Sequence, residues 1–265
     1  SRYIITNGAL SDAGVTNEYG VGGDDCTFPL GVAGTYTPST FNVTSTGGVV
    51  GSVTVKPINS YHPAVQTGYG NDELQYYWNV TSTGFNNPTL THSFTYLPTD
   101  VRGVEADYVS GRFFNYQWLD DVADNSGVVD LGNHTITHSD VNYIDGEYTA
   151  GVAANFVTKP ILYSIASGDW YNGNTWSTTS GGAPYGNYPD GNPVVIENNH
   201  TVTVTANGAY AYSMDIQLGS TLDILDTREH NFGHVKGGGT IKIAATDKGS
   251  FIFPGGFYDD FMNTA

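Results

Sequence analysis

The alternation of apolar and polar residues along the chain predicts β-strands almost throughout. It is clearest from Pro193 to Phe253, where short runs alternate apolar residues with Thr, Asp or Lys and end in Gly, Asn or Asp. An apolar residue at every second position is typical of a half-buried strand, whereas a helix repeats about every 3.6 residues. Many short strands with brief polar turns predict coils stacked on one another, as in a β-solenoid or β-roll. We therefore expect this stretch to be a scaffold.

Turn residues divide the first half of the chain into further short strands. The predicted strands are residues 2–6, 74–81, 89–97, 113–119, 132–138 and 146–153. In addition, Gly47-Gly48 stands between two strand-like runs, at 36–43 and 51–57, and predicts a hairpin. Strands of this length between turn signals predict an all-β fold that begins with an antiparallel, Ig-like β-sandwich.

These patterns divide the chain into three parts. Residues 1–23 are expected to hold an N-terminal strand that continues a preceding module, and residues 24–157 to form the β-sandwich. Residues 158–265 are expected to form a linker at Thr158-Lys159-Pro160, a loop with two tryptophans, and the β-solenoid-like domain. We interpret this loop as a cap on the first coil, because the open end of a stacked sheet needs covering.

Composition and charge restrict the classes of partner. The 265 residues include 26 acidic and 9 basic ones, giving a formal net charge of -17, and only 13% are charged. This acidity argues against nucleic acid, whose affinity comes from Lys and Arg, and against an anionic membrane surface. No apolar run approaches the roughly 18 residues of a membrane span. Cys26 is the only cysteine, so we expect no internal disulfide.

Several turn glycines and aromatic residues follow one another in a recognisable order. The second half carries Gly168-Asp169-Trp170, Asn174-Thr175-Trp176-Ser177, His200-Thr201-Val202-Thr203-Val204 and Gly239-Thr240-Ile241. This order resembles a module repeated in very large secreted surface proteins of Bacteroidota. The first half resembles the module that often precedes it, in Arg2–Gly8, Phe28–Gly31, Tyr77–Val80 and Gly146–Gly151.

The resemblance implies a structural or adhesive protein of the cell surface. Proteins of this kind are exported by type IX secretion and include gliding-motility adhesins and long surface filaments. The resemblance thus implies a secreted location and, as partners, neighbouring modules of the same protein or other copies in a fibre. We expect the sequence to be a piece of such a longer protein. The matching motifs are structural, so they indicate lineage better than activity.

Glycans are the other class of partner that the sequence suggests. Trp170, Tyr171, Trp176, Tyr185 and Tyr188 lie in one stretch rich in Gly and Asn. Exposed aromatic rings flanked by Asn and Asp can stack on sugars, so these five residues are the candidate carbohydrate-binding site. The alternative, which we favour, is that both tryptophans belong to the end cap or to the interface between the domains.

Carboxylates in predicted loops make calcium the metal to consider. Asp120, Asp121 and Asp124 are the candidate ligands of a structural Ca²⁺, which prefers hard oxygen donors from loops. The alternative is a solvated acidic loop, and neither an EF-hand nor a calcium-binding nonapeptide repeat is present. His230 and His234, on either side of a turn, are a second candidate pair. We expect no other cofactor.

We do not expect an enzyme, because the sequence lacks a catalytic constellation. It has no G-x-S-x-G, H-E-x-x-H or P-loop motif. Asp215 and Asp223 lie near successive predicted coils, and they are the one candidate acid–base pair for polysaccharide cleavage. The hypotheses, in order, are a structural or adhesive surface module, a carbohydrate-binding module, and a polysaccharide-cleaving β-solenoid enzyme.

Overall fold

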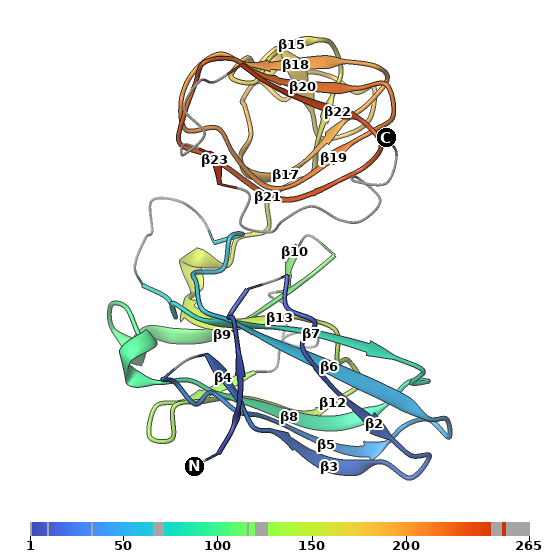
Figure 1. Cartoon of the computed structure of the whole chain (residues 1–265), viewed down its shortest axis with the longest axis vertical. Coiled ribbons are helices and arrows are strands. Elements are labelled where there is room, and N and C mark those ends of the chain that lie inside the picture. The colour runs from blue at the N-terminus through green and yellow to red at the C-terminus, as the bar shows by residue number, and fades with distance from the viewer. Residues whose placement is uncertain are drawn as a thin grey trace. The chain divides into compact units, whose positions relative to one another are not determined.

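The computed structural model describes residues 2–9, 11–32, 34–65, 72–115, 117–119, 127–244 and 251–252. The chain divides into two compact units, Ser1–Thr158 and Lys159–Ala265, which we describe separately (Figure 1). Both units are built of β-strands. The helices among the described residues are short 3₁₀ turns, at Pro98–Asp100, Glu105–Asp107, Ala153–Asn155 and Gly173–Thr175.

Unit 1 contains two antiparallel sheets. The six-stranded sheet consists, in spatial order, of β10 (Gln117–Leu119), β9 (Tyr108–Phe114), β13 (Gly146–Val152), β7 (Tyr77–Thr83), β6 (Gly51–Ile58) and β2 (Val15–Tyr19). The five-stranded sheet consists of β11 (Val128–Asp130), β12 (Thr135–Val141), β8 (Thr89–Thr95), β5 (Ser39–Ser45) and β3 (Asp24–Phe28). A small parallel pair, β1 (Ile4–Thr6) with β4 (Leu30–Val32), completes the unit.

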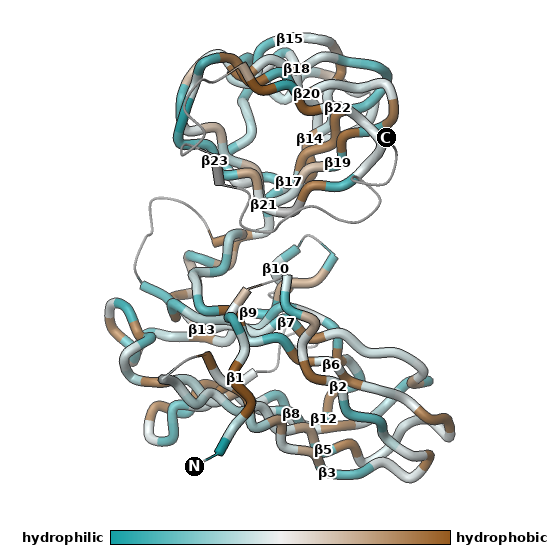
Figure 2. Tube along the Cα trace, viewed as in Figure 1, coloured by the Kyte–Doolittle hydropathy of each residue, from teal (hydrophilic) through white to brown (hydrophobic). Residues whose placement is uncertain are grey.

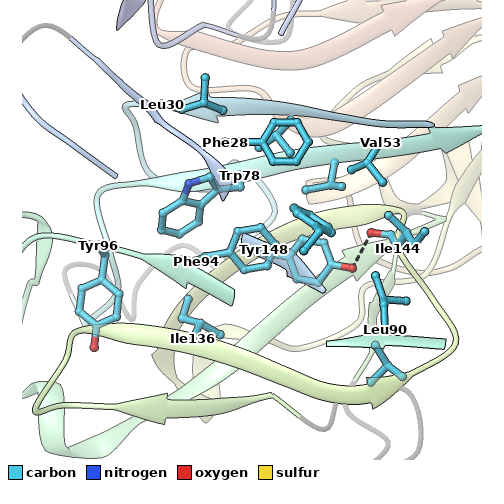
Figure 3. Close-up of a cluster of buried hydrophobic side chains, with 14 of the residues drawn as sticks. Phe28, Leu30, Val53, Trp78, Leu90, Phe94, Tyr96, Ile136, Ile144 and Tyr148 are labelled. Atoms are coloured by element: carbon cyan, nitrogen blue, oxygen red, sulfur yellow. Dashed lines mark hydrogen bonds between the residues drawn. The ribbon is translucent and has the colours of Figure 1, made fainter. Parts of the chain in front are cut away.

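The two sheets of unit 1 enclose one hydrophobic core. Val53 on β6 and Trp78 on β7 come from one sheet, Leu90 and Phe94 on β8 come from the other, and all four are fully buried (Figure 3). Phe94 stacks on Tyr148 of the opposite sheet, with ring centroids 4.7 Å apart. The strands supply these side chains because every second residue of a strand points to the same face. The prediction of an all-β fold with antiparallel sheets is therefore confirmed.

Two predictions of local structure in unit 1 are wrong. The runs on either side of Gly47-Gly48 form no hairpin, because β5 pairs with β3 and β8, whereas β6 belongs to the other sheet and pairs with β2 and β7. The turn therefore carries the chain from one sheet to the other. Residues 113–119 are not one strand either. Asn115 adopts a left-handed backbone with φ 50°, and β10 folds back on β9.

The first 23 residues are part of unit 1. Within them β1 pairs with β4, and β2 pairs with β6 over Val15–Tyr19, and our expectation that these residues continue a preceding module stays a prediction. Tyr19, at the end of β2, is fully buried in the core of the sandwich. The sequence pattern did not reveal this, because strand pairing across distant residues is set by packing.

Unit 2 contains two parallel ladders of strands. The first ladder is β14 (Leu162–Ser164), β17 (Asp190–Ile196), β19 (Tyr210–Ile216), β21 (His230–Lys236) and β23 (Phe251–Ile252), with β16 (Trp176–Ser177) antiparallel beside β14. The second ladder is β15 (Gly168–Asp169), β18 (Thr201–Val204), β20 (Thr221–Ile224) and β22 (Thr240–Ile243). From β17 on, successive strands alternate between the ladders, so the chain passes through both in each coil (Figure 1).

The coils of unit 2 stack in register around their own core. Val194 pairs with Met214, which pairs with Val235, and these positions are 20 and 21 residues apart in sequence. On the other ladder the paired side chains are Val202, Leu222 and Ile241. Apolar and polar residues alternate along the strands (Figure 2), and the apolar ones point inward. The predicted alternation over 193–253 thus corresponds to parallel strands.

Candidate functional site

The loop that carries the two tryptophans begins at the first coil of unit 2. Trp170 follows β15 directly and Trp176 begins β16, and both side chains are fully buried. Their ring centroids are 5.3 Å apart in an edge-to-face arrangement, and the Trp176 indole Nε1 donates to the Trp170 carbonyl oxygen at 2.7 Å. Trp170 also packs against Phe232 of β21, with ring centroids 5.5 Å apart. These rings belong to the core of the unit.

Polar residues of the same loop hold its backbone in place. The Asp169 carboxylate accepts a hydrogen bond from the Tyr171 backbone N–H at 2.7 Å, and the Asn172 side chain accepts one from the Asn174 N–H at 3.0 Å. The Thr175 hydroxyl donates to the Asp169 carbonyl at 2.8 Å. Side chains of this kind satisfy turn backbone that no sheet can pair. The Asn and Asp residues beside the aromatic rings therefore have a structural use.

Burial divides the candidate carbohydrate-binding residues into two groups. Trp170 and Trp176 are 0% exposed and are not available for stacking on a sugar, whereas Tyr185 is 40% and Tyr188 42% exposed. Tyr171 lies edge-to-face with Tyr188, with ring centroids 5.2 Å apart, and its hydroxyl donates to the Asn207 carbonyl at 2.8 Å. Burial raises the pKa of Tyr171 to about 12. The exposed rings of the candidate carbohydrate-binding site are therefore those of Tyr185 and Tyr188.

The described residues include only part of the predicted metal ligands. Asp120, Asp121 and Asp124 lie outside the described residues, as does the side chain of His234. His230 is buried: its Nδ1 accepts from the Ala209 N–H at 3.1 Å and its Nε2 is 2.9 Å from the Thr227 hydroxyl oxygen. Burial also lowers the pKa of His230. Within the described part of the chain, no three His, Cys, Asp or Glu side chains are placed to hold a metal ion.

Asp215 and Asp223 lie on different ladders of one coil. Asp215 is on β19 between the inward-pointing Met214 and Ile216, and Asp223 is on β20 between Leu222 and Ile224. Each carboxylate therefore points away from the shared core, on its own face of the unit. Asp215 is 3.6 Å from the Lys236 amine on the next coil, with which it is in register. The predicted acid–base pair does not form.

A polar cluster that the sequence did not predict lies on the outer face of the six-stranded sheet. The His62 Nε2 is 2.9 Å from one Glu147 carboxylate oxygen, and the Asn79 side-chain amide donates to the other oxygen at 3.0 Å. His62 and Glu147 are 2% and 7% exposed. The rings of Tyr77, Phe113 and Trp118 pack around His62, with centroids 4.8, 5.2 and 4.6 Å from it. We name His62, Asn79 and Glu147 the outer-face cluster.

A second unpredicted group lies between the two sheets of unit 1. The His138 Nδ1 is 3.0 Å from the Tyr143 hydroxyl oxygen, and its Nε2 is 3.1 Å from that of Ser110. His92 is fully buried, and neither of its ring nitrogens has a hydrogen-bond partner among the described residues. Burial, with smaller contributions from His138 and Arg112, holds the pKa of His92 well below its usual range. Sequence gave no signal for this group, because its members are widely separated along the chain.

Comparison with known proteins identifies no relative of this chain. No protein-family model matches it, and neither the curated proteins nor the solved structures include a match. Among the described residues no helix is long and apolar enough to cross a membrane.

Proposed function

We propose that this chain is a structural or adhesive module of a long extracellular cell-surface protein, with an Ig-like β-sandwich followed by a short β-solenoid. The observation that carries the proposal is the in-register stacking of unit 2, in which each coil pairs with the coils before and after it. A stack of this kind grows along one axis, because each repeat contacts only its neighbours. The motifs that resemble Bacteroidota surface modules support the extracellular location.

The use of polar side chains also supports a structural role. Asp169, Thr175 and His230 hydrogen-bond turn backbone, and Asp215 pairs with Lys236 of the next coil. Such groups hold coils in place and need no substrate. The formal net charge of -17 favours repulsion between neighbouring fibres and keeps them soluble.

The location is tested by immunogold labelling of intact cells with an antibody raised against this chain. A surface module predicts gold particles along extended material outside the cell envelope. Labelling that needs permeabilised cells would contradict the proposal. The adhesive role is tested by coating beads with the chain and measuring attachment to host or bacterial surfaces, with beads coated with an unrelated acidic β-protein as the control.

A carbohydrate-binding module is the second candidate, and one observation favours it. Tyr185 and Tyr188 remain 40% and 42% exposed on one Gly-rich loop, so their rings are accessible for stacking on a sugar. A glycan array compares the wild-type chain with Tyr185→Ala/Tyr188→Ala. Tyr36→Ala is the matched control, because Tyr36 is 37% exposed in unit 1. Glycan binding lost only in the double variant supports this candidate, and an array without binding removes it.

A further inference from the structure

Three residues with complementary chemistry lie side by side on adjacent strands of the six-stranded sheet. Lys56 on β6 is directly opposite Asn79 on β7, and Asn79 is directly opposite Glu147 on β13. Their neighbours Val55, Val80 and Tyr148 are buried in the core between the sheets. Since successive residues of a strand point to opposite faces, Lys56 lies on the same outer face as Asn79 and Glu147 and forms one row with them. The row holds an amine, a carboxamide and a carboxyl group.

The carboxyl group of this row is held against the amide. One Glu147 oxygen accepts from the Asn79 amide nitrogen at 3.0 Å, and the other is 2.9 Å from His62 Nε2. The His62 Nδ1 accepts from the Ala64 backbone N–H at 3.1 Å, so in the neutral ring the proton is on Nε2 and is donated to Glu147. The carboxyl is thereby fixed beside the bond between the Asn79 carbonyl carbon and its nitrogen.

The surroundings of the carboxyl group are poor in water. Glu147 is 7% exposed, and the His62 ring beside it is enclosed by Tyr77, Phe113 and Trp118. Burial, with the adjacent Glu147 charge, raises the pKa of Tyr77 well above its usual range. In such surroundings a proton moves from an ammonium to a carboxylate at lower cost than in water, because the neutral pair needs less solvation.

Lys56 can reach the amide by a change of rotamer. Directly opposite residues of an antiparallel pair have Cβ atoms about 5 Å apart, which is within the length of a lysine side chain. The half-buried Lys56 leans toward the β2 side of its strand, where an added Cβ on Gly14 would lie 2.8 Å from its Cγ. No acidic side chain of the described residues forms an ion pair with Lys56. Rotamer changes of this kind take picoseconds to nanoseconds at exposed positions.

We propose that Lys56 and Asn79 form an intramolecular amide cross-link between β6 and β7, with Glu147 as the proton-transfer group. The Lys56 ammonium first gives a proton to the Glu147 carboxylate. The neutral Nζ then attacks the Asn79 carbonyl carbon and forms a new C–N bond. Glu147 returns its proton to the departing Asn79 nitrogen and takes up one of the two protons on Nζ, and the other proton stays as the N–H of the new amide. The old C–N bond breaks, ammonia leaves, and Glu147 ends as the neutral acid. No oxidant, metal or nucleotide is needed.

His62 is a positioning residue in this reaction. Its Nε2 lies 2.9 Å from the Glu147 carboxyl group and fixes the orientation of the carboxyl oxygens. The cross-link would join two strands that hydrogen bonds already pair, and it would resist their separation under load. The proposal rests on strand register and contacts, and it does not depend on the cellular location or the adhesive role of the chain.

The test is the intact mass of the full chain under denaturing conditions, measured after purification and after prolonged incubation of the folded protein. The wild type is expected to be lighter than its sequence mass by one ammonia. Lys56→Arg, which keeps the charge but supplies no amine nucleophile, and Glu147→Gln are expected to have their full sequence masses. Peptide mapping of the wild type with a glutamate-specific protease, which cleaves after Glu73 between the two residues, is expected to give a branched peptide that joins Lys56 to Asn79.

Two controls distinguish the cross-link from other reactions that release ammonia. Succinimide formation at Asn7-Gly8, Asn172-Gly173 or Asn207-Gly208 also releases ammonia, but it would persist in Lys56→Arg. Lys236→Arg in unit 2 is expected to keep the mass loss. Near-UV circular dichroism checks the fold of Glu147→Gln. If Glu147→Gln does not fold, the solvent-facing Lys56→Arg still tests the proposal. A wild type with its full sequence mass, or an equal mass loss in Lys56→Arg, overturns the proposal.

Discussion

His92 on β8 and His138 on β12 face each other across the strand pair, with ring centroids 4.9 Å apart inside the core of unit 1. The other titratable or charged groups of this cluster are Arg112, Tyr143 and Tyr148. None of these supplies a negative charge near neutral pH, and the Arg112 guanidinium is positive. A proton on either imidazole would therefore add a second positive charge inside the core.

We predict that acid destabilises unit 1 through this histidine pair. Burial first, and then Arg112, lowers the pKa of His138 from 6.5 to about 3, and the pKa of His92 is lowered in the same direction. The unfolded chain then binds more protons than the folded one between pH 6.5 and about 3, so stability is full above pH 6.5 and falls as the pH decreases through this window. At pH 5 the expected loss through His138 is about 2 kcal/mol, and His92 adds to this loss in the same direction.

Urea unfolding as a function of pH checks this prediction. His92→Phe/His138→Gln is expected to be less sensitive to acid than the wild type, whatever its stability at neutral pH. His200→Gln in unit 2 should leave the unfolding of unit 1 unchanged. An equal acid sensitivity of the double variant and the wild type would exclude the pair as the cause.

Glu73 is predicted to destabilise unit 1 as the pH rises, which is opposite to the effect of the histidine pair. Its side chain is 4% exposed, one of its oxygens has no hydrogen-bond partner among the described residues, and burial raises its pKa from 4.5 to about 8. The folded chain then holds a proton that the unfolded chain releases, so stability falls as the pH rises from 4.5 to 8, by about 1.4 kcal/mol per pH unit. Glu73→Gln should remove this loss, and the difference between variant and wild type should grow from pH 5 to 8. A constant difference would contradict the shift.

The two buried tryptophans are predicted to stabilise unit 2, with no direct part in ligand binding. Trp176→Ala leaves a large cavity in a fully packed core and is expected to cost about 4 kcal/mol of unfolding free energy. Tyr188→Ala, at a 42% exposed ring, is expected to cost less than about 1 kcal/mol. Chemical denaturation followed by near-UV circular dichroism measures both. Equal small losses in the two variants would show that Trp176 is not a core residue.

Gly31 on β4 is predicted to tolerate no side chain. A Cβ at this position would overlap the Thr35 carbonyl oxygen and lie 3.0 Å from the Tyr3 ring. Because the obstacle is backbone, relief requires movement of the β4 turn, and Gly31→Ala is expected to cost about 3 kcal/mol. Gly22→Ala is the matched control, since nothing lies within 4 Å of an added Cβ there. Thermal unfolding of both variants checks the difference, and equal melting temperatures would refute the overlap.

Periodicity alone was enough to predict short strands in the alternating stretch of unit 2 that begins at Pro193. The apolar positions of β18 and β20, at Val202, Val204, Leu222 and Ile224, are the buried ones. The reason is that in an extended chain every second side chain points to the same face, so an alternating pattern places all its apolar residues on one face, which is then buried. The linker expected at Thr158-Lys159-Pro160, where the strand pattern breaks, stays a prediction of the sequence.

Tertiary structure alone decided which strands pair and which side chains meet. The turn at Gly47-Gly48 has the same residues whether it closes a hairpin or crosses between sheets, and the packing of β5 and β6 selects the crossing. Trp170 and Tyr188 were both candidates for stacking on a sugar, with a structural role favoured for Trp170, and only the folded chain shows that Trp170 is buried and Tyr188 exposed. Likewise, Lys56, Asn79 and Glu147 come together only through register, since contacts over long sequence separations depend on the packing of the whole unit and leave no local pattern.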